Sequence, residues 1–234
     1  MTEYKSWPLG KLPPEFQRPE LDQIKKLGYD WKDPREVVTM FENKVAKFAG
    51  AEYGVAVDCC THGLFLSLLF YRDVLKMVNE FVEIPSYTYC SVPMQIRHAG
   101  YTPKFADYQW SGKYQLKPFD IWDGAVRWTE GMYEGGFHIV SFQLKKRIPI
   151  GRGGMILTDD PVAAEWFRKM TYDGRDLTIG YMEDDFQYLG YHYYMTPEDA
   201  ARGIILMDQI PKKNLDSGNN TTYSDLSTKK VFYE

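Results

Sequence analysis

Cysteine is scarce in this chain of 234 residues, and basic residues never form long blocks. The three cysteines are Cys59, Cys60 and Cys90, a pattern without CxxC spacing. Because neighbouring cysteines rarely pair with each other, neither a disulfide framework nor a cysteine-bound metal is expected. The longest basic block is Lys145-Lys146-Arg147 and the net charge is −4, so neither a nucleic-acid partner nor a basic membrane-surface helix is expected.

Long hydrophobic runs are also missing. The longest one, residues 64–70, is interrupted by Ser67 and is far too short to span a bilayer. The first residues contain no apolar stretch of the kind that export signals carry. These absences predict a cytoplasmic protein without a membrane partner. What the chain has in abundance is aromatic residues, 16% of the total, which suit a core, an interface or a ligand pocket.

The order of the apolar segments predicts the organisation of the chain. Residues 1–35 are rich in proline and are expected to form an irregular N-terminal arm. Apolar residues then recur at three- and four-residue steps before Gly50, which predicts an amphipathic helix over 36–49. Further strands are expected at 54–57, 81–84, 102–105, 119–122, 137–142 and 154–158, and further helices at 61–74, 91–98, 161–170 and 196–210.

This alternation of strands and helices predicts an α/β domain over residues 36–211, with a mostly parallel sheet and flanking helices. Residues 212–234 are dominated by polar and small side chains and are expected to form an extended or mobile C-terminal tail. Ligands of such sheets bind at the carboxyl ends of the strands. The candidate functional residues are therefore sought there.

Two of the strand ends carry groups that could bind a planar phosphorylated ligand. Cys60 and Thr61 follow the first strand, and Thr61 either caps the next helix or adds a hydroxyl to a phosphate site at the helix start. Tyr89 follows the strand at 81–84, and its ring either stacks on a ligand or packs in the core or an interface.

Two further strand ends carry ionisable groups. Asp123 either holds a metal or a protonated ring nitrogen, or forms a turn with Gly124. Asp120, three positions earlier, points to the opposite face of an extended strand. Ser141 and Lys146 lie before a glycine cluster whose spacing matches neither a P-loop nor a dinucleotide-binding fingerprint.

Each of these signals is weak alone, but as a set they match the needs of pyridoxal phosphate (PLP). PLP requires phosphate donors, a stacking aromatic ring, a carboxylate at its ring nitrogen and a lysine that attaches it. The same segments resemble, in one continuous order over residues 36 to about 210, the DegT/DnrJ/StrS family of PLP-dependent aminotransferases. The resemblance rests on Phe41-Glu42 through Gly50, Pro85-Ser-Tyr-Thr-Tyr89, Asp123-Gly-Ala and, most specifically, Ser141 followed by Lys146 and the glycines.

The resemblance implies the fold-type-I large domain and a role for each site residue. Lys146 would attach the cofactor and act as the catalytic base, and Asp123 would contact the pyridine nitrogen. Tyr89 would cover the ring face, while Ser141, Cys60 and Thr61 would bind the phosphate. It further implies transfer of an amino group, within a homodimer with shared active sites.

 The amino donor implied by the resemblance is L-glutamate, and the acceptor is a nucleotide-linked keto sugar.

The chain departs from the family pattern at three places. Cys60 replaces the usual glycine of the phosphate loop. In Gly190-Tyr-His-Tyr-Tyr-Met195, His192 stands where the family has the Asn that crosses to the phosphate of the partner subunit, and Tyr194 stands where it has Arg. The sequence also stops where the family begins its small C-terminal domain. Residues 1–35 and the aromatic stretch 186–194 are the segments expected to cross to the partner.

Three other functions remain open from the sequence. A catalytically silent structural or interaction homologue is compatible with the departures at Cys60 and His192. A PLP-dependent sugar dehydratase is disfavoured, because related dehydratases carry histidine in place of Lys146. A bare NAD-type domain is disfavoured because no GxGxxG motif follows the first strand.

Overall fold

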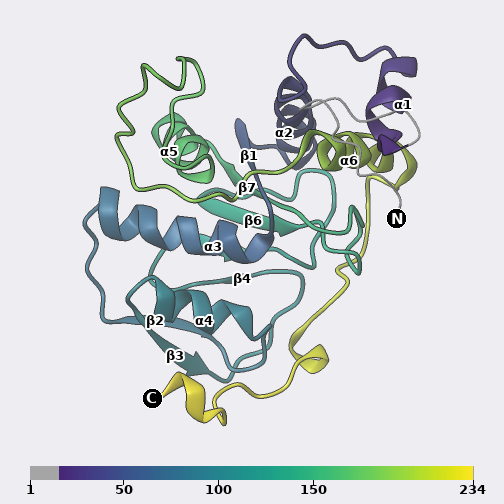
Figure 1. Ribbon diagram of the computed structural model, residues 1–234. Helices are drawn as coiled ribbons and strands as arrows, with labels where there is room; N and C mark the ends of the chain where they lie inside the picture. Colours follow the sequence, from purple (N-terminus) through teal and green to yellow (C-terminus); the bar gives the residue numbers. More distant parts are fainter. Residues whose placement is uncertain (1–15, 234) are drawn as a thin grey trace, which may run out of the picture.

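A computed structural model describes residues 16–233 of the chain. Its centre is a five-stranded sheet in the order β1-β7-β6-β5-β4, and β2 and β3 form a separate two-stranded sheet (Figure 1). The strands are β1 (Tyr53–Val57), β2 (Phe81–Pro85), β3 (Thr102–Ala106), β4 (Tyr114–Gln115), β5 (Ile121–Asp123), β6 (Phe137–Ser141) and β7 (Gly154–Thr158). The α-helices are α1 (Glu20–Lys26), α2 (Glu36–Ala49), α3 (Cys60–Leu69), α4 (Ser91–His98), α5 (Pro161–Thr171) and α6 (Pro197–Gln209).

The directions of the strands correct the expectation of a mostly parallel sheet. In the central sheet only β5 and β6 are parallel neighbours, whereas β1–β7, β6–β7 and β4–β5 are antiparallel. The chain between β6 and β7 contains no crossover helix, so β7 returns beside β6 in the opposite direction. By contrast, α4 connects β2 to β3, and these two strands are parallel.

One edge of the sheet nevertheless collects several carboxyl ends. Strands β1, β5 and β6 all run in the same direction, because β1 and β6 are each antiparallel to β7. Gly154, the first residue of β7, pairs with Val57 of β1 and with Ser141 of β6. Asp123, the last residue of β5, pairs with Ile139, two residues before the end of β6. The edge expected to bind the ligand is therefore formed even though the sheet is mixed.

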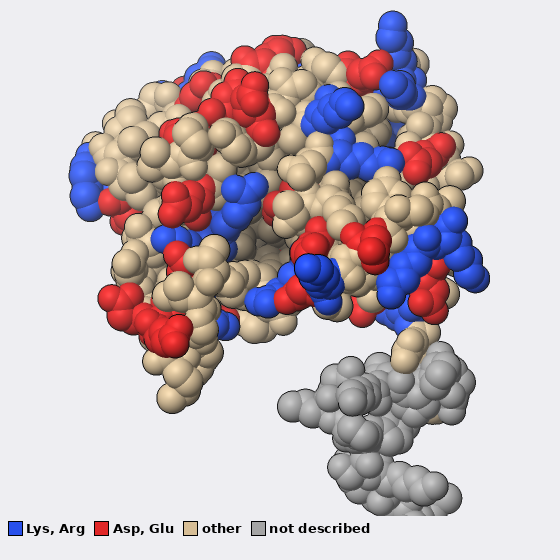
Figure 2. Space-filling view, turned by 90° about the horizontal axis from the view of Figure 1, so that it is seen from above, with Lys and Arg blue, Asp and Glu red and all other residues tan. Residues whose placement is uncertain are grey.

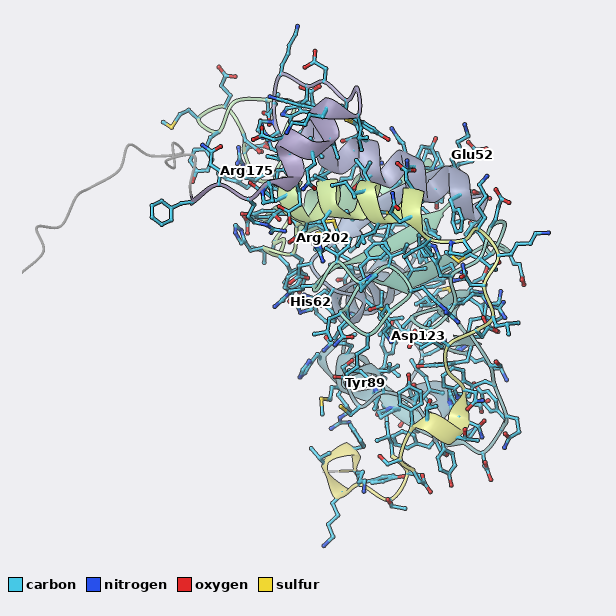
Figure 3. The ribbon with its side chains drawn as sticks, turned by 90° about the vertical axis from the view of Figure 1, so that its right-hand side faces the viewer. Glu52, His62, Tyr89, Asp123, Arg175 and Arg202 are labelled. Atoms are coloured by element: carbon cyan, nitrogen blue, oxygen red, sulfur yellow. The ribbon has the colours of Figure 1, made fainter. Side chains whose placement is uncertain are left out.

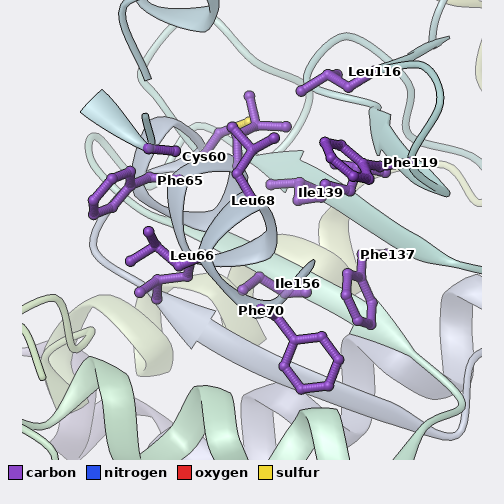
Figure 4. Packing of buried hydrophobic residues seen from close by; sticks show 14 of the residues in the cluster. Cys60, Phe65, Leu66, Leu68, Phe70, Leu116, Phe119, Phe137, Ile139 and Ile156 are labelled. Carbon is purple, nitrogen blue, oxygen red and sulfur yellow. The ribbon is translucent and has the colours of Figure 1, made fainter. Parts of the chain in front are cut away.

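Helices cover both faces of the central sheet. On one face, α1, α2 and α6 pack over Val140, Met155 and Leu157. On the other face, α3 and α5 pack over Ile139 and Ile156, whose side chains alternate with those of the first set (Figure 4). Helix α3 also contacts α4, so it lies between the central sheet and the unit formed by α4, β2 and β3 (Figure 1). This position fixes the start of α3 beside the edge described above.

The sequence suggested an irregular N-terminal arm, but part of this arm is helical. Residues 20–26 form α1, because the side chain of Ile24 is fully buried against the α2–α6 face. Residues 1–15 of the predicted arm lie outside the described residues. Within residues 16–233, no helix is both long and apolar enough to cross a membrane.

Four other segments differ from the sequence prediction. The helix expected over 61–74 ends as α-helix at Leu69 and continues as a π-helix over Phe70–Val74. Strand β5 begins two residues later than expected, and the two-residue strand β4 was not predicted. The C-terminal tail carries two 3₁₀ turns, Asn220–Thr222 and Lys230–Phe232, and its Leu226 is buried.

Candidate active site

A cavity of about 520 Å³ opens at the edge where β1, β5 and β6 end. Its size lies within the usual range of small-molecule sites. Six of the seven site residues predicted from the sequence line it, namely Cys60, Thr61, Tyr89, Asp123, Ser141 and Lys146. In Figure 3, Asp123 and Tyr89 lie in the middle and lower part of the molecule, between the central sheet and the C-terminal tail. The structure thus brings together residues from four separate loops.

The start of α3 forms one wall of the cavity. Cys59 is the N-cap residue, in an extended conformation, and it makes no side-chain capping hydrogen bond. Thr61 is not the cap, because it lies inside the helix and its hydroxyl is hydrogen-bonded to Ser91 Oγ at 2.9 Å. The N–H groups of an uncapped first helical turn are free to bind an anion. This corrects the reading of Thr61 as a helix cap.

A close contact between β7 and α3 shapes the same wall. A Cβ atom on Gly154 would lie 2.5 Å from the backbone nitrogen of Cys60 and 2.8 Å from the carbonyl carbon of Cys59. Only glycine therefore allows β7 to begin directly against the helix start. The side chain of Cys60 points into the core, where burial raises the pKa of its thiol well above the usual value. Cys60 is thus a packing residue with its backbone at the cavity.

Asp123 is a buried carboxylate at the floor of the cavity. Its Oδ2 accepts a hydrogen bond from the Tyr114 hydroxyl at 2.7 Å, and its Oδ1 accepts one from the backbone N–H of Ala125 at 2.9 Å. Burial raises the pKa of Asp123, while these two hydrogen bonds and the charge of Lys146 act in the opposite direction. The Tyr114 hydroxyl also hydrogen-bonds Thr88, which fixes its direction. A carboxylate held in this way can accept a proton or hydrogen bond from a ligand cation.

Asp120 has the opposite environment, as the sequence suggested. It lies on the exposed side and accepts a hydrogen bond from Trp122 Nε1 at 2.7 Å. Asp123 is thus buried at the end of β5, whereas Asp120, directly before β5, is exposed.

Lys146 and Lys145 are neighbours in the loop after β6, but their environments differ. Lys146 is half-buried whereas Lys145 is exposed. Burial raises the pKa values of Asp123 and Cys60, and the charge of Lys146 opposes this rise at both groups. No carboxylate within residues 16–233 forms an ion pair with it. Its backbone N–H donates to the carbonyl of Gln143 at 2.8 Å, which holds the loop in a turn.

The aromatic wall combines one predicted ring with two that the sequence did not reveal. Tyr89 lines the cavity with 59% of its surface exposed. Trp110 and Tyr223 also line the cavity and stack on each other, with ring centroids 5.8 Å apart. Burial raises the pKa of Tyr223 to about 12. Tyr223 comes from the polar tail, which gave no periodic signal, and Tyr114 comes from a strand too short to leave a pattern.

His192 is the one predicted site residue that does not line this cavity. It lines a smaller cavity of about 260 Å³ together with Asp58, Arg152 and Tyr194. Its side chain is 69% exposed, and Nδ1 is hydrogen-bonded to Asp173 Oδ2 at 2.9 Å. Within one chain, His192 therefore does not reach the residues around Lys146.

Comparison with known proteins places this geometry in a family. The model of the DegT/DnrJ/EryC1/StrS aminotransferase family matches residues 18–122 and 131–225. The chain belongs to this family. Ser141, Lys146 and the start of α3 lie within the matched segments, whereas Asp123 lies in the gap between them, so its assignment rests on its position in the structure.

Relatives and solved structures agree with this placement. The spore coat polysaccharide biosynthesis protein SpsC of Bacillus subtilis (strain 168) is 27% identical over 199 residues, which are 66% of this chain and 50% of the relative. The crystal structure of AtS13 from Actinomadura melliaura has a TM-score of 0.66 at 19% identity and covers 81% of this chain and 64% of that chain. DesI, crystallised in the presence of its TDP-sugar product, has a TM-score of 0.59 at 23% identity and covers 81% of this chain and 56% of that chain.

These comparisons show the fold, that of the fold-type-I PLP-dependent aminotransferases. The chain spans about half the length of the curated relative that it matches. Figure 2 shows basic and acidic side chains intermingled on the face that it views.

The residues around the cavity fit PLP. The uncapped first turn of α3 and the Ser141 hydroxyl offer donors for a phosphate, and Asp123 offers a buried carboxylate for a ring nitrogen. Lys146 offers a half-buried amino group that forms no ion pair with a carboxylate of residues 16–233. The donor set at each end of the cavity therefore matches the two charged ends of the cofactor.

Proposed function

We propose that this protein is a PLP-dependent aminotransferase that transfers an amino group from L-glutamate to the keto carbon of a nucleotide-linked sugar. The observation that carries the proposal is the convergence of Lys146, Asp123 and the open start of α3 on one cavity. Membership of the aminotransferase family supports the reaction class. The TDP-sugar product named for DesI supports the substrate class.

When bound, PLP supplies an electron-withdrawing ring that stabilises negative charge at the substrate carbon. The N–H groups at the start of α3 and the Ser141 hydroxyl would bind its phosphate, and Asp123 would hold the proton of its ring nitrogen. Lys146 would hold the cofactor and would move a proton at the reacting carbon as general base and acid. Tyr89 would cover the ring face and exclude water from it.

The contacts of Asp123 support its role. Because the Tyr114 hydroxyl and the Ala125 N–H each donate to one carboxylate oxygen, the group cannot rotate away from the cavity without breaking a hydrogen bond. Tyr114 therefore acts as a positioning residue for Asp123, and Thr88 does the same for Tyr114. The acidic group that controls the ring is thus held before the ligand arrives.

The half-reaction with the donor tests this function. PLP-loaded protein is mixed with L-glutamate, and we expect about one equivalent of 2-oxoglutarate per active site before any acceptor is added. Addition of a TDP-linked keto sugar should then yield the amino sugar. Lys145→Ala should behave like the unchanged protein, whereas Lys146→Ala should release no 2-oxoglutarate. PLP binding without any 2-oxoglutarate would support the catalytically silent alternative instead.

A further inference from the structure

A cluster of three ionisable side chains lies at the start of α3, beside the candidate active site. Ligand atoms of Asp58, Cys59 and His62 all lie within 4.8 Å of one another. His62 Nδ1 and Asp58 Oδ1 are 2.6 Å apart, and the His62 ring stacks on Tyr193 with centroids 3.7 Å apart. The His62 ring is therefore held by a carboxylate on its edge and an aromatic ring on its face. Figure 3 shows His62 on the same level of the molecule as Asp123.

Positive charges lie around this cluster and disfavour a metal cation there. Arg152 Nη2 lies 2.6 Å from Asp58 Oδ2 and so places a fixed positive charge beside the cluster. The positive end of α3 begins at Cys60, directly after Cys59. Burial alone would lower the pKa of His62, but the hydrogen bonds with Asp58 and Cys59 outweigh it and raise this pKa to about 9. The imidazole is then a cation at neutral pH, which opposes metal binding and stabilises a thiolate.

Cys59 is also one of the residues that line the cavity. Cys59 is partly exposed and lines the cavity, whereas Cys60 is buried in the core. Cys90 is the most exposed of the three cysteines. Within residues 16–233, however, the Asp58–Cys59–His62 group is the one cluster of this kind, and Cys90 does not belong to it. Exposure and activation therefore separate the three cysteines.

We propose that Cys59 is a nucleophilic thiol site that reacts with small disulfides such as oxidised glutathione. The thiolate of Cys59 attacks one sulfur of the disulfide, the S–S bond of the disulfide breaks, and a mixed disulfide forms on Cys59. The departing thiolate takes the proton of the His62 imidazolium, so the products are the modified protein and one free thiol. Asp58 acts as a positioning residue that holds the His62 ring.

A mixed disulfide on Cys59 would occupy the wall of the cavity at the start of α3. If the proposed function is correct, this is the phosphate end of the cofactor site, and modification and PLP binding exclude each other. That exclusion rests on the proposed function, whereas the reactivity of Cys59 does not.

Site-resolved reaction rates test the proposal on the full chain. The protein without added cofactor is exposed to oxidised glutathione at pH 7, and peptide mass mapping follows the modification of Cys59 and Cys90 separately. Cys59 has the His62 imidazole in its cluster, whereas Cys90 does not belong to this cluster, and a neighbouring cation speeds the attack of a thiol on a disulfide. We expect Cys59 to react about tenfold faster than Cys90.

A matched variant separates activation from exposure. His62→Gln removes the cation but keeps a hydrogen-bonding side chain, and it should slow Cys59 about tenfold while the rate of Cys90 stays unchanged in the same molecules. The unchanged Cys90 rate and an unchanged circular dichroism spectrum report that the variant is folded. Equal rates at Cys59 and Cys90, or a Cys59 rate that does not respond to His62→Gln, would overturn the proposal.

Adding Zn²⁺ or PLP to the same reaction tests two further points. Added Zn²⁺ should leave the Cys59 rate within about twofold; strong protection by Zn²⁺ would show a metal site and contradict the thiol proposal. Added PLP should slow Cys59 and not Cys90. If Cys59 is fast but PLP does not protect it, the thiol site stands and the placement of the phosphate in the proposed function fails.

Discussion

Glu42 is a fully buried carboxylic acid on α2, remote from the cavity around Lys146. Its Oε1 accepts a hydrogen bond from the backbone N–H of Ala56 at 2.8 Å, and Arg168 lies 3.6 Å from its other oxygen. Burial raises the pKa of Glu42 from 4.5 to about 7, and it outweighs the opposing effects of Arg168 and the Ala56 N–H. The folded state therefore binds a proton more tightly than the unfolded state does.

The raised pKa of Glu42 makes the free energy of unfolding depend on pH in a definite direction. The stabilisation that the folded state gains by binding the Glu42 proton is fully present below about pH 4.5, and it is lost as the pH rises through about 7. At about 1.4 kcal/mol per pKa unit, the loss amounts to about 3 kcal/mol. Urea unfolding measures the free energy of unfolding of Glu42→Gln and of the unchanged protein. Between pH 4.5 and pH 8, the value for Glu42→Gln should rise relative to that of the unchanged protein by about this amount. If the free energies of unfolding of the two proteins changed with pH in the same way, the raised pKa of Glu42 would be contradicted.

Asp123 and Asp120 form a matched pair for testing the chemistry at the residue scale. Asp123→Asn keeps the shape of the side chain and removes a buried charge, so folding should be retained. It cannot hold the ring proton as firmly, and 2-oxoglutarate release from L-glutamate should slow by at least about 100-fold. Asp120 is exposed and lies directly before β5, so Asp120→Asn should release 2-oxoglutarate at a rate within about twofold of the unchanged protein. A fast Asp123→Asn variant with bound PLP would remove Asp123 from the catalytic role.

Several residues of the candidate active site could be predicted from the sequence because each of them lies at or directly after the end of a strand. Asp123, Ser141 and Lys146 are visible in the sequence, since polar residues directly after buried strands meet at one edge. Tyr114 and Tyr223 were missed for physical reasons. Tyr114 acts through a hydrogen bond across two strands, and Tyr223 reaches the cavity by a path of the tail that local sequence does not determine.

At the scale of elements, periodicity predicted where most helices and strands lie but not how strands pair. The helix over 36–49 and the strand over 154–158 match the structure. The direction of β7 depends on a contact with β1, about 100 positions earlier in the chain, and such pairing is set by tertiary packing. Helix α1 likewise forms because Ile24 is buried against other helices, which the proline-rich composition around it conceals.

The C-terminal tail is an element whose packing can be tested with two leucines. Leu226 is 4% exposed, and its backbone N–H donates to the carbonyl of Ser86 at 2.9 Å. Leu215, in the same tail, is 86% exposed. Leu226→Ala should lower the free energy of unfolding by about 2–4 kcal/mol, whereas Leu215→Ala should change it by less than about 0.5 kcal/mol. Equal effects in chemical unfolding would mean that the tail does not pack against β2 in solution.

At the scale of the whole molecule, we expect a homodimer with shared active sites. The segment 177–189 exposes many apolar side chains, and Met182 and Leu189 are 91% and 96% exposed. Exposed apolar surface of this kind favours burial against a second subunit. Its end overlaps the stretch 186–194 that the sequence predicted for the interface, and His192 in this stretch is exposed and does not line the cavity around Lys146.

Sedimentation velocity at micromolar concentration tests this assembly. The unchanged protein should sediment as a dimer, and Met182→Ser combined with Leu189→Ser should shift it toward monomer. Val78→Ser is the control, because Val78 is 89% exposed but lies outside the segment. A monomer that binds PLP and transaminates would contradict shared active sites.

The measurement that tests the central claim most directly is the site of covalent cofactor attachment. The PLP-loaded protein is reduced with borohydride, digested and mapped by mass spectrometry. The account predicts the pyridoxyl mass on Lys146, the half-buried lysine whose charge acts on Asp123, and none on the exposed Lys145. A pyridoxyl mass on Lys145, or on no lysine at all, would contradict it.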